Sequence, residues 1–219
     1  MKFILLFVLF NIFSVLNISE ANAAGLPQTR FIYQEKSGPA SVVIVNPDPH
    51  EVLIQVYVDS KDSVSSNIRV YPSVFTLPAN GRRIVKIYGL NNFLLDREES
   101  IRYLHVATIP PEGDKGSALK MVVNARYKMM LRPNNMANGK LEEAVNALKV
   151  SCDGSDCFLV NSSPFNIVLS ELEVNGRNVE VDYIAPNKKI LVSKGTPKTI
   201  IGKYINDNGD YIPLPRFSF

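Results

Sequence analysis

Short runs of alternating apolar and polar residues, separated by clusters of Pro, Gly, Asn and Asp, fill the first half of the chain. Because strand side chains point alternately to the two faces of a sheet, this period of two predicts half-buried β-strands. The predicted strands cover residues 30–34, 40–46, 52–59, 68–71, 74–77, 82–88, 100–109 and 119–131. Short strands with turn-forming residues between them favour an antiparallel β-sandwich.

A second series of predicted strands follows a polar linker at residues 134–140. These strands cover residues 148–151, 158–161, 166–174, 178–183, 189–192, 196–204 and 213–217. Asn175-Gly176 is a strong signal for a two-residue hairpin turn, and residues 140–147 are either one helical turn or a loop. The pattern predicts an all-β chain of two β-sandwich domains, residues 24–136 and residues 137–219.

The last strand of the first half, residues 119–132 with its closing arginine, has a long apolar face. Leu119, Met121 and Val123 share one side of its first half. Such a row usually packs into its own domain, but it can also be offered to another polypeptide. For Val122, on the opposite side, we expect packing into the core of its own domain.

The first 23 residues have the pattern of a cleaved secretory signal peptide. Lys2 precedes an apolar run over residues 3–16, and Ala21-Asn22-Ala23 supplies small residues for cleavage after Ala23. The run is shorter than the about 20 residues that a membrane-spanning helix needs. Removing this segment removes one basic and one acidic residue, so the net charge of +3 is unchanged.

Composition and motifs exclude several classes of function. A mild, dispersed net charge of +3 does not indicate nucleic-acid binding. The chain lacks the usual nucleophile, phosphate-binding, zinc and dinucleotide motifs, and it has only two histidines, His50 and His105. We therefore expect no enzyme activity, no cofactor and no metal. Asn161-Ser162-Ser163 matches a glycosylation sequon, but Pro164 follows and we interpret the segment as a turn.

Two cysteines occur in the string Cys152-Asp-Gly-Ser-Asp-Cys157. An exported protein can oxidise them, and the Asp-Gly between them suits a hairpin. We expect a disulfide between Cys152 and Cys157. Half of a metal site is the alternative, although the histidines are remote in sequence and no further cysteine is present.

Seven residue strings occur in a particular order along the chain. They are Thr29-Arg30-Phe31-Ile32-Tyr33, Asn46-Pro47, Asp96-Arg97-Glu98-Glu99-Ser100, Ile109-Pro110-Pro111, Tyr127-Lys128-Met129-Met130-Leu131-Arg132-Pro133, Val174-Asn175-Gly176 and Tyr204-Ile205-Asn206-Asp207-Asn208-Gly209. In this order the chain resembles the PapD-like periplasmic chaperones of the chaperone–usher pathway, over essentially its whole mature length. The resemblance implies two immunoglobulin-like domains set at an angle, with a subunit-binding cleft between them.

The resemblance implies that Arg30 and Lys128 bind the C-terminal carboxylate of a pilus subunit. A terminal carboxylate needs charge-assisted hydrogen bonds, which an Arg and a Lys supply. From the residues alone, the two cations could instead pair with Asp or Glu inside the fold.

Leu119, Met121 and Val123 match the donor strand of the family, and Ala125 would be its small continuation. Subunits of this family lack their last strand, and the chaperone strand fills the apolar groove that this leaves. The segment before Leu119 is short, so the chain resembles the short-loop class, which is associated with rod-like pili.

Glu99, Arg132 and Asp207 match an interdomain ion network of the family, with Asp210 as an alternative to Asp207. Such a network would fix the angle between the domains more than it would add stability. The chain departs from the family in its brief N-terminus before Thr29 and in the position of its cysteine pair.

Together these features predict a periplasmic chaperone. It would bind pilus subunits by donor-strand complementation, prevent their premature assembly and deliver them to an outer-membrane usher. It would not bind nucleic acid or insert stably into a membrane, and whether the free protein dimerises stays open. The alternative is a secreted two-domain structural or adhesive module of a surface fibre.

Overall fold

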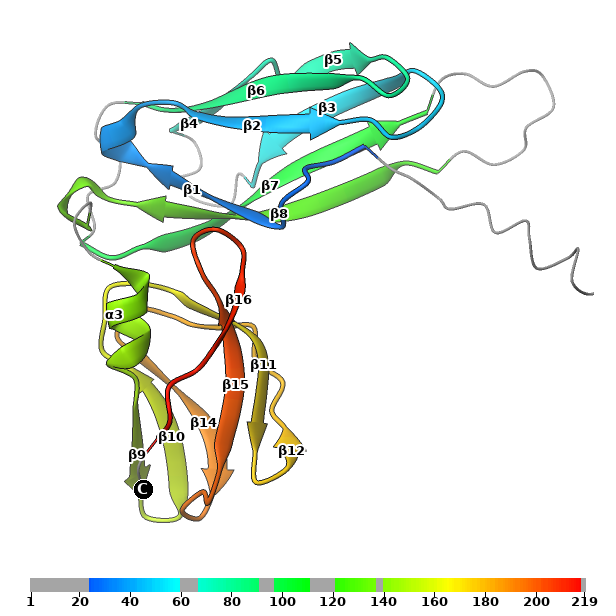
Figure 1. Ribbon diagram of the computed structural model, residues 1–219. Helices are drawn as coiled ribbons and strands as arrows, with labels where there is room; N and C mark the ends of the chain where they lie inside the picture. Colours follow the sequence, from blue (N-terminus) through cyan, green and yellow to red (C-terminus); the bar gives the residue numbers. More distant parts are fainter. Residues whose placement is uncertain (1–23, 60–66, 91–96, 111–120, 137–139, 218–219) are drawn as a thin grey trace, which may run out of the picture.

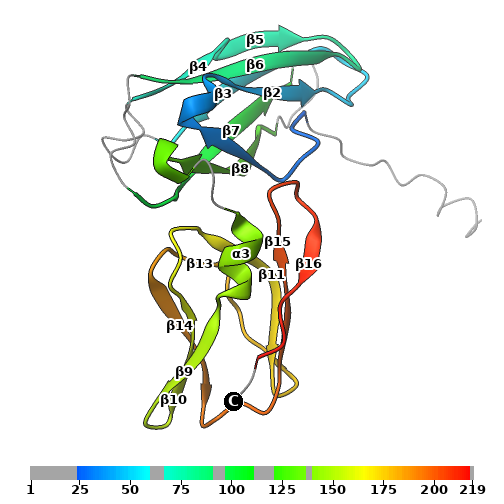
Figure 2. The same cartoon turned by 60° about the vertical axis from the view of Figure 1, so that its left-hand side comes forward.

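A computed structural model describes residues 24–59, 67–90, 97–110, 121–136 and 140–217. It confirms the prediction of two β-sandwich domains, which are set at an angle and meet at a junction (Figure 1). Figure 2 shows the one α-helix of the described residues beside this junction, where the chain enters the second domain. The predicted signal peptide, Leu119 and Asp96 lie outside the described residues.

The first domain consists of a five-stranded and a three-stranded sheet. Its strands are β1 (Arg30–Gln34), β2 (Ala40–Val45), β3 (Val52–Val58), β4 (Ile68–Tyr71), β5 (Val74–Leu77), β6 (Arg82–Gly89), β7 (Ser100–Ile109) and β8 (Val123–Arg132), with short 3-10 turns η1 (Glu35–Ser37) and η2 (Asn134–Met136). The sheet orders are β1-β8-β7-β3-β5 and β2-β6-β4. β1 runs parallel to β8, while β7 and β8 pair antiparallel over their whole shared length.

The second domain begins with helix α3 and continues in short strands. Its elements are α3 (Leu141–Asn146), β9 (Lys149–Asp153), β10 (Asp156–Asn161), β11 (Ile167–Val174), β12 (Arg177–Asn178), β13 (Tyr183–Ile184), β14 (Lys188–Lys194), β15 (Ile200–Ile205) and β16 (Tyr211–Pro213). One sheet has the order β14-β10-β9 and the other β12-β11-β15-β16, with β13 also on β11. The predicted hairpin turn joins β11 to β12, with positive φ at Asn175 and Gly176, as a type I′ turn requires.

Each domain has a hydrophobic core of its own, and strand alternation explains both. In β3, Val52, Ile54 and Val56 are buried while the residues between them are exposed. One core is built from residues between 24 and 131, and the other from residues between 136 and 204. Burial of each such side chain contributes roughly 1.5–3 kcal/mol before entropic costs, so each sandwich has a source of stability that does not depend on the other.

A buried asparagine closes the end of one strand in each domain. The Asn161 side-chain amide lies in the second core and donates to the carbonyls of Phe165, Ile184 and Ala185 at 2.7–3.1 Å. Its oxygen accepts the backbone N–H two residues later. Asn46 makes the same set of contacts in the first domain. The interpretation of the Asn-Ser-Ser segment as a turn is therefore confirmed.

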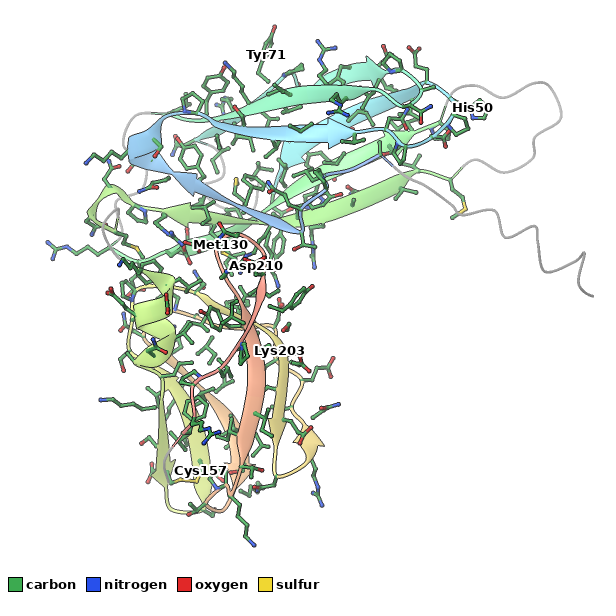
Figure 3. The ribbon with its side chains drawn as sticks, in the orientation of Figure 1. His50, Tyr71, Met130, Cys157, Lys203 and Asp210 are labelled. Atoms are coloured by element: carbon green, nitrogen blue, oxygen red, sulfur yellow. A yellow bond between two sulfur atoms is a disulfide. The ribbon has the colours of Figure 1, made fainter. Side chains whose placement is uncertain are left out.

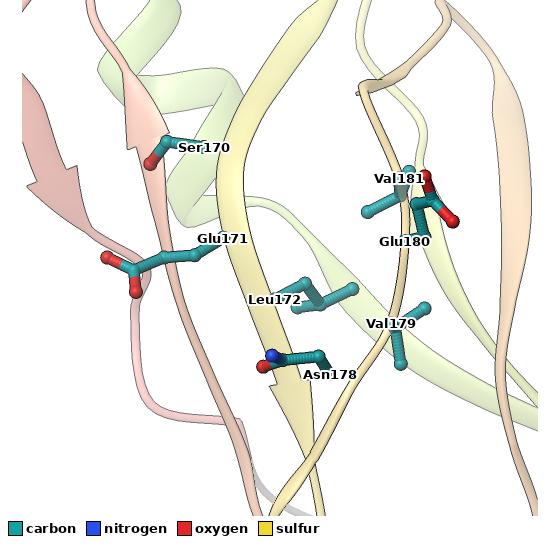
Figure 4. A pocket seen from close by; sticks show the side chains of 7 residues that line it. All are labelled: Ser170, Glu171, Leu172, Asn178, Val179, Glu180 and Val181. Carbon is teal, nitrogen blue, oxygen red and sulfur yellow. The ribbon is translucent and has the colours of Figure 1, made fainter.

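The prediction of one continuous strand over residues 178–183 is wrong, because two short strands, β12 and β13, stand at its ends. β12 and β13 keep one register on β11, from Glu173 opposite Asn178 to Val168 opposite Tyr183. Residues 179–182 between them are a loop whose two ends still bond to β11, through the Val179 N–H to Leu172 and the Leu169 N–H to the Asp182 carbonyl. β11 has an irregularity near Ser170 in its pairing with β15, and such a bulge disrupts a ladder locally. A hollow of about 550 Å³ lies at this interruption (Figure 4).

The predicted strand at residues 213–217 is also misplaced. β16 covers Tyr211–Pro213 and pairs with β15. The predicted range contains Pro213 and Pro215, which lack the N–H that a ladder needs. The strand therefore ends where the prolines begin.

Replacing Asn161 with Ala should destabilise the second domain. The change leaves three buried carbonyls without their donor, and unsatisfied buried groups cost about 1–3 kcal/mol each, so we expect a loss of about 3 kcal/mol. Urea unfolding followed by circular dichroism would measure it. Ser162→Ala, at an exposed position of the same turn, should keep the wild-type midpoint, and equal midpoints for both variants would contradict this role of Asn161.

Candidate binding site at the domain junction

Arg30 and Lys128, far apart in the sequence, are neighbours in the structure. They are register partners on the parallel strands β1 and β8. Phe31 and Met129, the next residue on each strand, are buried in the first core, so alternation turns Arg30 and Lys128 to the other face, toward the second domain. Arg30 is buried, and the Lys128 side chain is 20% exposed. The fold thus brings together the two cations that the sequence singled out.

Both cations already contact the second domain. The Arg30 guanidinium donates from Nη2 to the carbonyls of Ile205 and Asn206, at the turn between β15 and β16. The Lys128 ammonium donates to the carboxylate of Asp182, in the loop between β12 and β13. Lys128 therefore does pair with an acidic residue inside the fold, which was the alternative that the residues alone left open.

Arg132 forms two hydrogen bonds to each of two carboxylates, one from each domain; those to Glu99 share one oxygen, and those to Asp207 are bidentate. Its Nε and Nη2 donate to Glu99 Oε1 at 3.0 and 2.8 Å, and its Nη1 and Nη2 donate to Asp207 at 2.8 and 3.1 Å. Asp210, the alternative to Asp207, instead accepts from the Asn206 side chain. These contacts connect the end of β8 to the second domain across the junction. A bidentate Arg–carboxylate pair holds its two groups in one orientation as well as attracting them.

Glu99 also reaches the second domain directly. Its Oε2 accepts the backbone N–H of Asn166 at 3.0 Å, its carbonyl accepts the Asn166 side-chain amide at 2.8 Å, and its own N–H donates to the Pro164 carbonyl at 2.8 Å. The ring of Phe165 lies 5.0 Å below the Arg132 guanidinium. We name Glu99, Arg132, Asp207 and Asn166 the junction network.

Glu99, Arg132 and Asn166 of the junction network are buried, while Asp207 lies at its exposed rim. Burial raises the pKa of Glu99, although Arg132 and the Asn166 N–H favour its charged form. Burial opposes the charge of Arg132, but hydrogen bonds to Asp207 and attraction to Glu99 raise its pKa. Burial lowers the pKa of Arg30. Attraction to Asp207 and Glu99 partly offsets this effect, and repulsion from Arg132 adds to it. Arginine stays charged at all relevant pH, so a second buried cation adjoins the network.

Arg30 is incompletely neutralised in this position. Its guanidinium contacts only backbone carbonyls, and its Nε has no hydrogen-bond partner among the described residues. A carbonyl carries a partial negative charge, whereas a carboxylate carries a full one and forms stronger bonds to guanidinium. Arg30 beside Lys128 is therefore suited to hold an anionic group.

The start of β8 exposes apolar side chains. Met121 is 70% exposed and Val123 is 42% exposed. The expectation that Val122 packs into the core is wrong, because it is 59% exposed. The pairing of β8 with β7 ends at Val123, opposite Thr108, so residues before it have left the sandwich. Ala125 is half-buried.

β8 has an open edge along the same segment. β7 flanks it from Val123 onward, but β1 covers its other side only from Lys128 to Arg132. Within the described residues, the edge from Val123 to Tyr127 faces no further strand. An unpaired edge with exposed apolar side chains is a template for the addition of a strand from another chain.

The cysteine pair lies far from this site. Cys152 and Cys157 are opposite each other in the β9–β10 hairpin and form a disulfide. Figure 3 shows Cys157 at the end of the second domain remote from the junction, where Met130 and Asp210 are labelled. Because the two sulfurs are bonded to each other, they do not form half of a metal site.

Three residues of the junction carried no signal in the sequence. Asp182 lies within the predicted strand at residues 178–183, and an acidic residue in a strand predicts only that its side chain faces solvent, not that it contacts the first domain. Phe165 and Asn166 follow a Ser-Ser-Pro turn, and an Asn at such a place indicates a turn rather than a partner for Glu99. Only their position opposite the first domain identifies them.

No helix in the described ranges is both long and apolar enough to cross a membrane.

Two family models match the chain. The model described as pili and flagellar-assembly chaperone, PapD N-terminal domain, matches residues 24–137. The model described as pili assembly chaperone PapD, C-terminal domain, matches residues 143–215.

Curated relatives and solved structures agree with these matches. The chain is 37% identical to the chaperone protein FanE of Escherichia coli over 88% of this chain and 85% of FanE. It is 29% identical to the chaperone protein LpfB of Salmonella typhimurium over 87% of each chain. A Salmonella enterica structure of the SafA pilin in complex with the SafB chaperone matches at 25% identity, with a TM-score of 0.77, over 90% of this chain and 96% of that one.

The substitution Glu99→Gln should change how stability depends on pH. The folded-state pKa of Glu99 is raised above its ordinary value of 4.5, so the folded state holds this proton more tightly than the unfolded state does. Glu99 therefore contributes stability that is fully present below the ordinary pKa and is lost as the pH rises through the folded-state pKa. The unfolding free energy of the wild type minus that of the variant should therefore decrease as the pH is raised from about 4.5 to about 7.5.

Urea unfolding at the two pH values would measure this difference. Glu98→Gln, at an exposed neighbouring position, controls for the loss of one negative charge. A difference that grows with pH would show that the ion pair with Arg132 outweighs the burial of Glu99.

Proposed function

The chain belongs to the PapD family of pilus-assembly chaperones, and we propose that it binds fimbrial subunits through the junction and the start of β8. In this proposal Arg30 and Lys128 anchor the C-terminal carboxylate of a subunit, and β8 completes its fold. The chaperone acts in the periplasm after removal of its signal peptide, prevents premature assembly, and passes the subunit to an outer-membrane usher. The alternative of a structural or adhesive fibre module is not favoured, because the relatives are chaperones.

The pairing of Arg30 with Lys128 is the observation that most directly supports the anchor. A terminal carboxylate has two oxygens, and the two register partners present a guanidinium and an ammonium side by side. Neither cation is locked into the junction network by a buried carboxylate: Lys128 pairs with the largely exposed Asp182, and Arg30 contacts carbonyls. Both are therefore available for exchange.

The open edge of β8 supports the second half of the proposal. A subunit strand added beside Val123–Tyr127 would continue the sheet by main-chain hydrogen bonds, and Met121 and Val123 would enter the apolar groove of the subunit. Leu119, two residues before Met121, would add a third side chain to the same side of the donor strand. Exposed side chains of this size each offer roughly 1.5–3 kcal/mol on burial, before the costs of association.

Arg30→Ala or Lys128→Ala should abolish recovery of the subunit while leaving the chaperone folded. The test is co-expression with a fimbrial subunit from the same source, purification of the chaperone from the periplasm, and measurement of the subunit bound to it. Each variant removes one donor of charge-assisted bonds to the carboxylate, and truncation of a buried charge partner typically costs about 2–5 kcal/mol.

Two matched variants control for the loss of a cation. Lys203→Ala removes a lysine from an exposed ion pair with Glu171, and Arg177→Ala removes an exposed arginine on β12. Both should recover the subunit as wild type does. Wild-type recovery with Arg30→Ala and Lys128→Ala would refute the anchor.

A charge on the donor side of β8 should prevent complex formation, whereas the same charge on the other side should be tolerated. We expect Met121→Asp and Val123→Asp each to lower recovery of the subunit roughly tenfold or more, since a buried apolar contact is replaced by a carboxylate. Val122→Asp, between them and similarly exposed, should have little effect. Equal losses at all three positions would show that alternation does not select the donor side.

A further inference from the structure

Asp182 occupies an unusual position for a surface carboxylate. It belongs to the loop of residues 179–182 between β12 and β13, and its backbone carbonyl accepts the N–H of Leu169 on β11 at 3.0 Å. From this loop of the second domain it reaches the Lys128 ammonium of the first domain. Its side chain remains 58% exposed, so the contact is made at the rim of the junction and not inside it.

The contact between Asp182 and Lys128 has the chemistry that a bound carboxylate would have. A carboxylate oxygen accepts a hydrogen bond from an ammonium group, and an aspartate side chain offers the same two oxygens as a chain terminus. Asp182 also lies close to Tyr103, the register partner of Lys128 on β7. Burial, and then the nearby Asp182 charge, raise the pKa of the Tyr103 hydroxyl. The carboxylate thus sits on the sheet face that presents Lys128.

The charges of the junction balance with Asp182 in place. Arg30, Lys128 and Arg132 are three cations, and Arg132 is matched by the buried or half-buried carboxylates Glu99 and Asp207. Asp182 supplies the third negative charge. A terminal carboxylate that displaced Asp182 from Lys128 would keep this balance, whereas one that bound beside it would add an unmatched negative charge.

We propose that Asp182 is an internal competitor for the terminal carboxylate of the subunit, which occupies Lys128 in the free chaperone and releases it when the subunit binds. This inference rests on the anchor proposed above. Asp182 acts through Lys128 and is a positioning residue that sets affinity. It lowers the affinity for any carboxylate that must take its place.

The geometry makes this exchange feasible. Loss of an exposed ion pair such as Asp182–Lys128 should weaken subunit binding by only about twofold to fivefold. A subunit that also gains a strand pairing and an apolar contact can therefore displace Asp182. The Arg132 guanidinium is buried, its pair with Glu99 is buried and its pair with Asp207 is bidentate, and removal of either partner would leave a poorly compensated buried charge. The junction therefore contains one ion pair suited to exchange beside others suited to remain.

The test measures how tightly chaperone variants bind a peptide that ends as the subunit ends. The probe is a fluorescein-labelled synthetic peptide with the last residues of the subunit that co-purifies, made with a free carboxylate and with an amidated end. Fluorescence anisotropy gives its dissociation constant. Asp182→Asn should bind the free-carboxylate peptide about twofold to fivefold more tightly than wild type. Its affinity for the amidated peptide should equal that of wild type.

Two further variants separate competition from a general effect of charge. Glu180→Gln removes an exposed carboxylate from the same loop and should bind both peptides as wild type does. Asp182→Glu keeps the competing carboxylate and should stay near the wild-type affinity. Thermal unfolding of each variant verifies that the domains remain folded.

The outcomes distinguish this inference from the proposed function. If wild type binds the free-carboxylate peptide, Lys128→Ala does not, and Asp182→Asn equals wild type or binds more weakly, then Asp182 does not compete while the anchor stands. Tighter binding by Glu180→Gln to the same extent would reduce the effect to net charge and overturn the inference. If wild type fails to bind, or Lys128→Ala binds equally well, then the anchor is wrong and the inference is wrong with it.

Discussion

The buried guanidinium of Arg132 is the contact on which the rest of the site depends. It holds Glu99 of the first domain and Asp207 of the second at the same time, and so relates the turn between β15 and β16 to the end of β8. That turn supplies the carbonyls that contact Arg30. β8 also carries Lys128 and continues from the exposed apolar segment, and β1 with Arg30 pairs with it, so the strand whose end Arg132 fixes relates all parts of the proposed binding surface.

The alternation of a single strand separates the two tasks of β8. Met129 and Leu131 enter the first core, whereas Lys128, Met130 and Arg132 face the junction. Met130 is buried but is not part of that core, and Figure 3 places it at the junction near Asp210. A shift of one residue in register would exchange core and junction side chains, so the pairing of β8 with β7 and β1 enforces the arrangement of charges.

Much of this arrangement could be predicted from the sequence, and the exceptions have physical reasons. The strands of the first domain follow from alternation, and the string around Lys128 and Arg132 indicated the cations. The loop at residues 179–182 could not be predicted, because the apolar residues Val179 and Val181 alternate with acidic ones as in a strand, and only the pairing with β11 shows where the strand is lost. The contact of Asp182 with Lys128 joins the two domains, so it depends on how the domains are set relative to each other. The prediction that Val122 is buried is wrong because alternation places a side chain in the core only where its strand covers that core, and the pairing of β8 with β7 ends at Val123.

The free protein gives both cations of its proposed binding surface a contact with the second domain and leaves the apolar half of that surface exposed. Lys128 has Asp182 and Arg30 has two carbonyls, so a bound carboxylate replaces existing contacts, and its net gain is limited to the stronger bond that it forms to Arg30. Met121 and Val123 have no comparable cover, and burying them is a net gain. In the proposed complex the donor row and strand pairing therefore supply most of the affinity. The anchor serves mainly to fix the position of the end of the bound polypeptide, and this position sets the register of the added strand. A charge pair in a fixed position discriminates between registers more than it stabilises any one of them.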